Sequence, residues 1–96
     1  MRIDYKATTS ELKADREVKV NAIKVMVTRA DGTVLTFDGD EESQKRLDRF
    51  SRGAVIAGMT EVPWKMADNS TVMVTPEEMI QAMVLAGQKQ AELWFI

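Results

Sequence analysis

The sequence predicts an α+β fold in which helices and short antiparallel hairpins alternate. Two runs of apolar, β-branched residues are each interrupted by a polar turn, and each run is followed by an acidic helix start and an amphipathic segment. The expected order is helix–hairpin–helix–hairpin–helix, with the hairpins packed on the three helices because an isolated hairpin is only marginally stable. The 96 residues suffice for one core, so we expect a single domain over 10–96 after an irregular lead-in at 1–9.

The first helix is predicted to begin at Ser10, whose hydroxyl can cap the first turn, and to run to about 22–24. The β-branched residues that follow favour a strand up to Thr28. Asp31-Gly32 then marks a turn, because glycine accepts the positive φ that primed hairpin turns require. The returning strand is expected over 33–37.

A second helix is expected after Asp40, which can cap the helix ahead of an acidic first turn. Gly58 is its expected stop. Its predicted apolar face is formed by Leu47, Phe50, Ala54 and Ala57.

The second hairpin is predicted from two apolar segments, 62–66 and 71–74, that flank the turn-forming pair Asp68-Asn69. The last helix begins with a capping box, in which Thr75 and Glu78 each satisfy a backbone amide of the other. Its apolar stripe at helical spacing consists of Met79, Ile80, Met83, Val84, Gly87, Ala91 and Trp94.

Composition argues against catalysis and against cofactor or metal binding. The chain has no Cys and no His, which removes thiolate chemistry, the usual general base and the commonest metal ligand. It contains no glycine-rich phosphate-binding loop. The acidic cluster at 38–42 lacks the spacing of a calcium loop and is explained by helix capping. We therefore expect no catalytic, cofactor-binding or metal site and no enzymatic activity.

The formal net charge is −2, which argues against a nucleic-acid partner. The charge is uneven: residues 1–30 carry seven basic and four acidic side chains, or +3, and this third could contact an acidic partner. Neither a signal-peptide pattern nor the roughly 18 apolar residues of a membrane span is present. We expect a cytoplasmic protein with no membrane contact.

Apolar side chains that could bind a partner fall into three groups. Trp64 precedes the second turn, two methionines lie on one face of the last helix, and the chain ends in an apolar tail. Exposed aromatic and methionine side chains are typical of interface cores, whereas in a chain this small they can also be core. The partner-binding candidates are Trp64, Met79, Met83, Leu93, Trp94, Phe95 and Ile96.

A series of short motifs occurs in a fixed order between Lys13 and the C-terminus. It comprises a basic helix, a Gly-to-Phe hairpin ending in Asp, a Ser-Gln helix start, a Trp followed by a polar turn, and a Thr-Pro-Glu-Glu helix start. These correspond to 16–23, 32–38, 40–47, 64–69 and 72–78. In this order the chain resembles a small domain of unknown function found in tail-fibre and tail-fibre-assembly proteins of tailed phages and prophages. The spacing from Gly32 to Phe37 is longer than in the family pattern.

The resemblance implies a non-enzymatic tail-associated protein, either a virion component or a tail-fibre assembly module that acts by protein–protein binding. Its partner would be a phage tail or tail-fibre protein, in the host bacterial cytoplasm during assembly or in the virion tail. Homo-oligomerisation is left open. The alternative is a small phage-encoded inhibitor of a host defence or regulatory protein, which would also be short, acidic and without catalytic residues.

Overall fold

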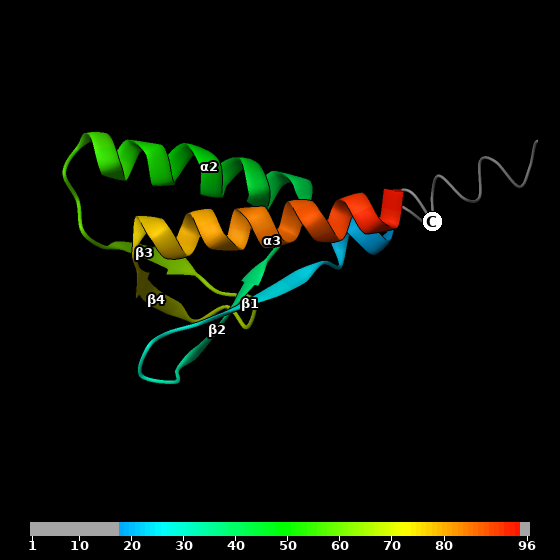
Figure 1. Ribbon diagram of the computed structural model, residues 1–96, viewed down its shortest axis with the longest axis horizontal. Coiled ribbons are helices and arrows are strands. Elements are labelled where there is room, and N and C mark those ends of the chain that lie inside the picture. Colours follow the sequence, from blue (N-terminus) through cyan, green and yellow to red (C-terminus); the bar gives the residue numbers. More distant parts are fainter. Residues whose placement is uncertain (1–17, 95–96) are drawn as a thin grey trace, which may run out of the picture.

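The computed structural model describes residues 18–94. In this range the fold is α+β, with two antiparallel hairpins on one side of a pair of long helices (Figure 1). The helix predicted from Ser10 is represented by helical residues 18–21, and its remainder lies outside the described residues, as does the lead-in at 1–9. The elements are β1 (Lys24–Thr28), β2 (Val34–Asp38), α2 (Glu41–Ile56), β3 (Val62–Lys65), β4 (Thr71–Val74) and α3 (Pro76–Trp94).

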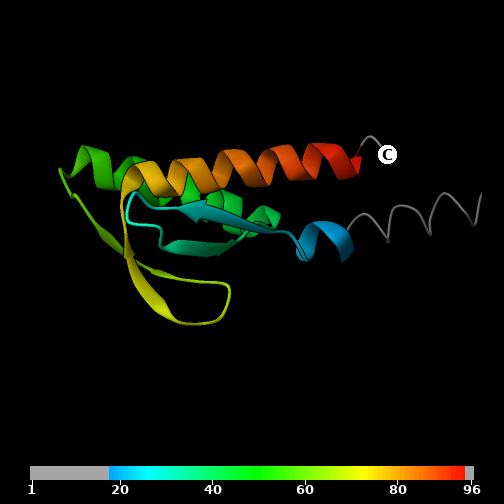
Figure 2. The same cartoon turned by 60° about the horizontal axis from the view of Figure 1, so that its bottom comes forward.

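The β1–β2 hairpin supplies much of the core. Its strands alternate between buried and outward side chains, as the pleat of a half-buried strand requires. Val25 pairs with Phe37 and Val27 with Leu35, and all four side chains are buried. Figure 2 shows β1 running beneath α3, which it contacts.

The hairpin predicted around Asp31-Gly32 is confirmed, but the turn differs from a two-residue primed turn. The Arg29 amide donates to the Thr33 carbonyl at 2.8 Å, which encloses three residues, and the Gly32 amide donates back to the Arg29 carbonyl at 2.9 Å. Gly32 has φ of 90°, whereas Asp31 has no positive φ. This is the pattern of a type I turn followed by one left-handed glycine, the common three-residue hairpin loop.

Both ends of α2 follow the predicted signals. The Asp40 carboxylate accepts from the Ser43 amide at 3.4 Å and caps the first turn. Gly58 has φ of 72°, and the amide of Met59 reaches back to the Ala54 carbonyl at 2.8 Å. A left-handed residue with this backward bond is the usual glycine C-cap, so the predicted start and stop are confirmed.

The buried face of α2 differs from the predicted one. Leu47 and Ala54 are buried as expected, but the third buried residue of the helix is Ser51. Its hydroxyl donates to the Asp48 carbonyl at 3.0 Å, so the helix itself satisfies the buried polar group. Phe50 directly precedes Ser51, and neighbouring residues of a helix point in different directions. With Ser51 in the buried face, Phe50 lies at the edge of that face and is 47% exposed.

The β3–β4 hairpin and the start of α3 confirm the predicted turn and capping box. Asn69 has φ of 71°, a conformation that asparagine tolerates. The Thr75 amide donates to Glu78 Oε1 at 2.9 Å, and the Glu78 amide donates to Thr75 Oγ1 at 3.2 Å. The chain therefore enters α3 with two of its otherwise unpaired amides satisfied.

The apolar stripe predicted on α3 is divided between core and surface. Met79 is fully buried beside Ala82 and Ala86, which the prediction did not include. Ile80 and Val84 are exposed. The stripe is wider than the surface that β1 and α2 cover, so its far edge faces outward. Within the described residues, neither long helix is apolar enough over a sufficient length to cross a membrane.

Candidate functional site

A hollow of about 370 Å³ lies between α2 and β3 and contains two aromatic rings. Phe50 reaches it from the edge of α2, and Trp64 from β3. We call it the aromatic hollow. Its lining residues are Asp38, Ser43, Arg46, Phe50, Trp64, Lys65 and Asn69.

The two rings pack edge to face, with centroids 5.8 Å apart and planes at 71°. This is a favourable geometry for an aromatic pair. Trp64 is half-buried, because one side of its ring packs against the core while the rest faces the hollow. The guanidinium of Arg49 lies over the Phe50 ring, 5.3 Å from its centroid. The hollow thus combines a fixed aromatic wall with adjacent positive charge.

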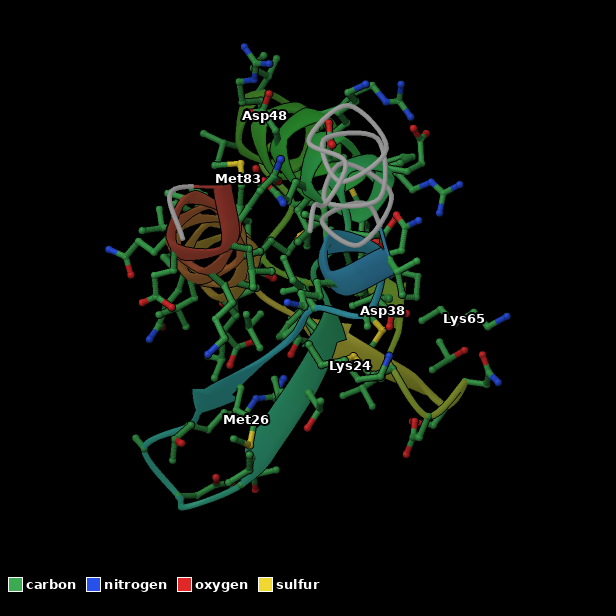
Figure 3. All side chains as sticks on the ribbon, turned by 90° about the vertical axis from the view of Figure 1, so that its right-hand side faces the viewer. Lys24, Met26, Asp38, Asp48, Lys65 and Met83 are labelled. Carbon is green, nitrogen blue, oxygen red and sulfur yellow. The ribbon has the colours of Figure 1, made fainter. Side chains whose placement is uncertain are left out.

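The charged residues around the hollow differ in whether they are paired within the chain. Asp38 already accepts from Lys24 at 3.0 Å, so its charge is compensated (Figure 3). Arg46 is 3.9 Å from Glu42, an exposed and weak pair. Lys65 makes no ion pair with any residue in 18–94. The rim therefore offers cationic groups to a partner, with no uncompensated carboxylate in the lining.

A second groove, about 540 Å³ in volume, lies between the two hairpins. The amide of Ala67 donates to the Thr36 carbonyl at 3.0 Å and ties the second turn to β2. The lining carboxylate of Asp68 accepts from Ser70, and this bond lowers the pKa of Asp68. Because its polar groups are engaged within the fold, this groove is the weaker candidate despite its larger volume.

Arg29 lines the groove between the hairpins but is held by an ion pair to α3. Its Nε donates to Glu78 Oε2 at 2.8 Å, its Nη2 donates to Glu78 Oε1 at 3.1 Å, and Nη2 also donates to the Met73 carbonyl. The hydrogen bond from Arg29 lowers the pKa of Glu78, and the same bond raises the pKa of Arg29. This pair joins the first hairpin, the second hairpin and the start of α3.

The predicted partner-binding residues are not gathered at one place. Trp64 lies in the aromatic hollow, and Met83 is half-buried in the outer groove between α2 and α3. Leu93 is half-buried against the core, and Met79 is enclosed in the core, which removes it from the accessible surface. Trp94 is the last residue of α3, and Phe95 and Ile96 lie outside the described residues. Figure 1 shows β3 near the start of α3, at the opposite end of the helix from residue 94.

Two residues of the site region were missed by sequence reasoning. Phe50 is predicted on the core face of its helix, but Ser51 is buried there instead, and no local pattern in the sequence indicates this exchange. Arg29 is 49 residues from its partner Glu78, and no local pattern identifies such a pair. Among the described residues, no group of three or more His, Cys, Asp or Glu side chains is placed to hold a metal ion.

Comparison with protein-family models gives a match over residues 4–95, nearly the whole chain, to the family described as "Domain of unknown function (DUF4376)". Comparisons with curated proteins and with solved structures gave no match. The predicted resemblance to a domain of unknown function is thereby confirmed, and its association with phage tails stays a prediction. On the extent of the family match, the chain belongs to the DUF4376 family.

Proposed function

We propose that this protein is a non-enzymatic binding module of a phage or prophage tail, either a virion component or a tail-fibre assembly factor. The single observation that carries binding as the mode of action is the aromatic hollow with its cationic rim. The tail context is inferred from the ordered motifs of residues 13–96. Assembly would then take place in the host bacterial cytoplasm, before or during incorporation into the tail.

The hollow suits an apolar side chain of a partner, inserted beside the edge-to-face pair of Phe50 and Trp64. Burying one such side chain contributes about 1.5–3 kcal/mol before the costs of association. Aromatic and arginine side chains carry much of the binding energy in protein interfaces, and both occur here. A partner with acidic residues around its apolar anchor would complement Arg46, Arg49 and Lys65.

The test is binding to tail and tail-fibre proteins of tailed phages and prophages, each immobilised and titrated with the purified chain. Phe50→Ala removes the exposed half of the aromatic wall and is expected to weaken binding at least about tenfold, or 1.4 kcal/mol. Ile56→Ala is the matched control, because Ile56 is a more exposed apolar residue of the same helix that does not line the hollow. Thermal melts of both variants establish that each is folded.

Equal binding by the wild type and Phe50→Ala would exclude the hollow as the contact surface. Failure of the wild type to bind any tail or tail-fibre protein would exclude the tail assignment. Binding through the same hollow to a host defence or regulatory protein would instead establish the alternative, an inhibitor. The variants therefore separate the choice of surface from the choice of partner.

A further inference from the structure

The outward side of α3 carries an apolar face that no described element covers. Ile80 and Val84 lie one turn apart and are 41% and 49% exposed. Met83 is half-buried between them and α2, and Gly87 and Ala91 continue the same side at helical spacing. A row of apolar side chains exposed on one side of a helix is a common feature of helix–helix interfaces.

α2 extends this face across the groove between the helices. Asp48 of α2 and Met83 of α3 line the same groove and lie near one another in Figure 3. Val55 follows Asp48 by seven residues, or about two turns, so it lies on the same side of α2. It is 61% exposed. The helix face is therefore defined by Val55, Ile80, Met83, Val84, Gly87 and Ala91.

Gly87 lies near the middle of this face, in the interior of a helix of 19 residues. Glycine destabilises a helix interior relative to alanine. Outside its own helix backbone, a Cβ at Gly87 would meet only Gln44 Oε1, at 3.9 Å, so packing within the described chain does not require glycine. A second helix crossing closely at this point would require it, because a missing side chain allows two backbones to approach.

The size and charge of the face fit a second copy of the chain. α3 is about 28 Å long and two helices are roughly 20 Å wide, so two copies would bury on the order of 1,100 Å², near the lower limit for stable interfaces. Three charged side chains of α2 line the groove at this face, Glu41, Lys45 and Asp48. Asp48 pairs with Arg52 of the same helix at 2.6 Å. The same face on a second copy therefore meets no uncompensated charge from this pair.

We propose that two copies pair through the helix face, with their α3 helices antiparallel and crossing at Gly87 on a two-fold axis. In this arrangement Met83 of each copy lies opposite Ala91 of the other, because both are four residues from the axis. A large side chain thus meets a small one on both sides of the crossing. This homodimer is independent of the aromatic hollow and of any tail partner.

The test is light scattering of the full chain over a concentration series, together with thermal melts. Wild-type mass is expected to rise from 10.8 kDa towards twice that value with a micromolar dissociation constant. Gly87→Ala is expected to raise the melting temperature of the monomer while weakening the dimer at least about tenfold. Gly53→Ala is the matched control, since Gly53 is a helix-interior glycine of α2 with nothing within 4 Å of an added Cβ, and it should leave dimerisation unchanged.

A second pair of variants tests the face without relying on glycine. Val84→Glu replaces an exposed valine by a better helix former, so the monomer stays folded while a charge enters the seam and the dimer is lost. Val34→Glu, at a similarly exposed valine of β2, should dimerise like the wild type. A wild type that remains at single-chain mass up to about 1 mM, a concentration at which even a weak dimer would form, would overturn the proposal. Equal dissociation constants for Gly87→Ala and Gly53→Ala would overturn the crossing point.

Discussion

The two hairpins have the same connectivity but different burial. β1 and β2 bury four side chains in the core beneath the helix pair, whereas in β3 and β4 only Val74 is fully buried, and Val62, Trp64 and Val72 are half-buried. The first hairpin is therefore a structural part of the core. The second is held against the core by one side and leaves its remaining apolar surface, including the Trp64 ring, available for contact. The core is thus built mainly on the first hairpin, and the surface that we propose for recognition lies at the second.

The largest effect is expected from Phe37→Ala in the first hairpin. Phe37 is fully buried, so the substitution removes a large apolar side chain and leaves a cavity. Such changes cost about 3–5 kcal/mol, a large part of the stability of a domain of this size. Chemical denaturation measures the loss. A cost below about 1 kcal/mol, the value of a single buried methylene, would mean that the first hairpin is not the core.

Replacing one valine by alanine in each hairpin compares the two hairpins directly, because the two valines differ in burial. Val27→Ala in β1 removes buried methyl groups and should cost about 2 kcal/mol, whereas Val72→Ala in β4 should cost about 1 kcal/mol or less. Denaturation midpoints of the two variants, measured side by side, give the difference. Equal losses would contradict the division between a core hairpin and a surface hairpin.

The link between the hairpins should depend on pH. The folded pKa of Glu78 lies below its ordinary value of 4.5, so the folded state binds fewer protons, and this stabilisation is present above about pH 4.5 and lost as the pH falls. Glu78→Gln should cost about 1–2 kcal/mol at pH 7 through the weakened cap and ion pair. The difference between wild type and variant should shrink towards pH 3 in denaturation experiments. A constant difference across this range would exclude the charged pair as its cause.

The smallest effect is expected at Gly53 on the exposed side of α2. An added Cβ meets no atom within 4 Å, and alanine is the better helix former, so Gly53→Ala should stabilise the chain by up to about 1 kcal/mol. A thermal melt measures the shift. Destabilisation would contradict the open position of Gly53 on an exposed side of the helix.

The sequence predicted those features that depend on neighbouring residues. Asp40, Gly58 and the Thr75–Glu78 box act within one helical turn, so their patterns are local and were confirmed. The side each helix presents to the core was predicted less well. The apolar stripe of α3 is wider than the surface that covers it. In α2, only the packing of the fold decides that Ser51 is buried and Phe50 is not.

The same distinction applies to the candidate site. Trp64 is predicted as a partner-binding residue because exposed aromatic side chains are typical of interface cores, and it lines the hollow. Its neighbour Phe50 and the ion pair of Arg29 arise from residues brought together by the packing of separate elements. A single sequence contains no signal for such contacts. A single residue of the site could therefore be predicted from the sequence, but the set of residues that the fold brings together there could not.

Native-state hydrogen exchange of the free protein tests the division between the hairpins most directly. The amides that pair β1 with β2 are expected to exchange only through global unfolding, with protection equal to the stability measured by denaturation. Those that pair β3 with β4 are expected to exchange through a local opening of lower free energy, because few fully buried side chains hold that hairpin. Equal protection in both hairpins, at the level of global unfolding, would contradict the account.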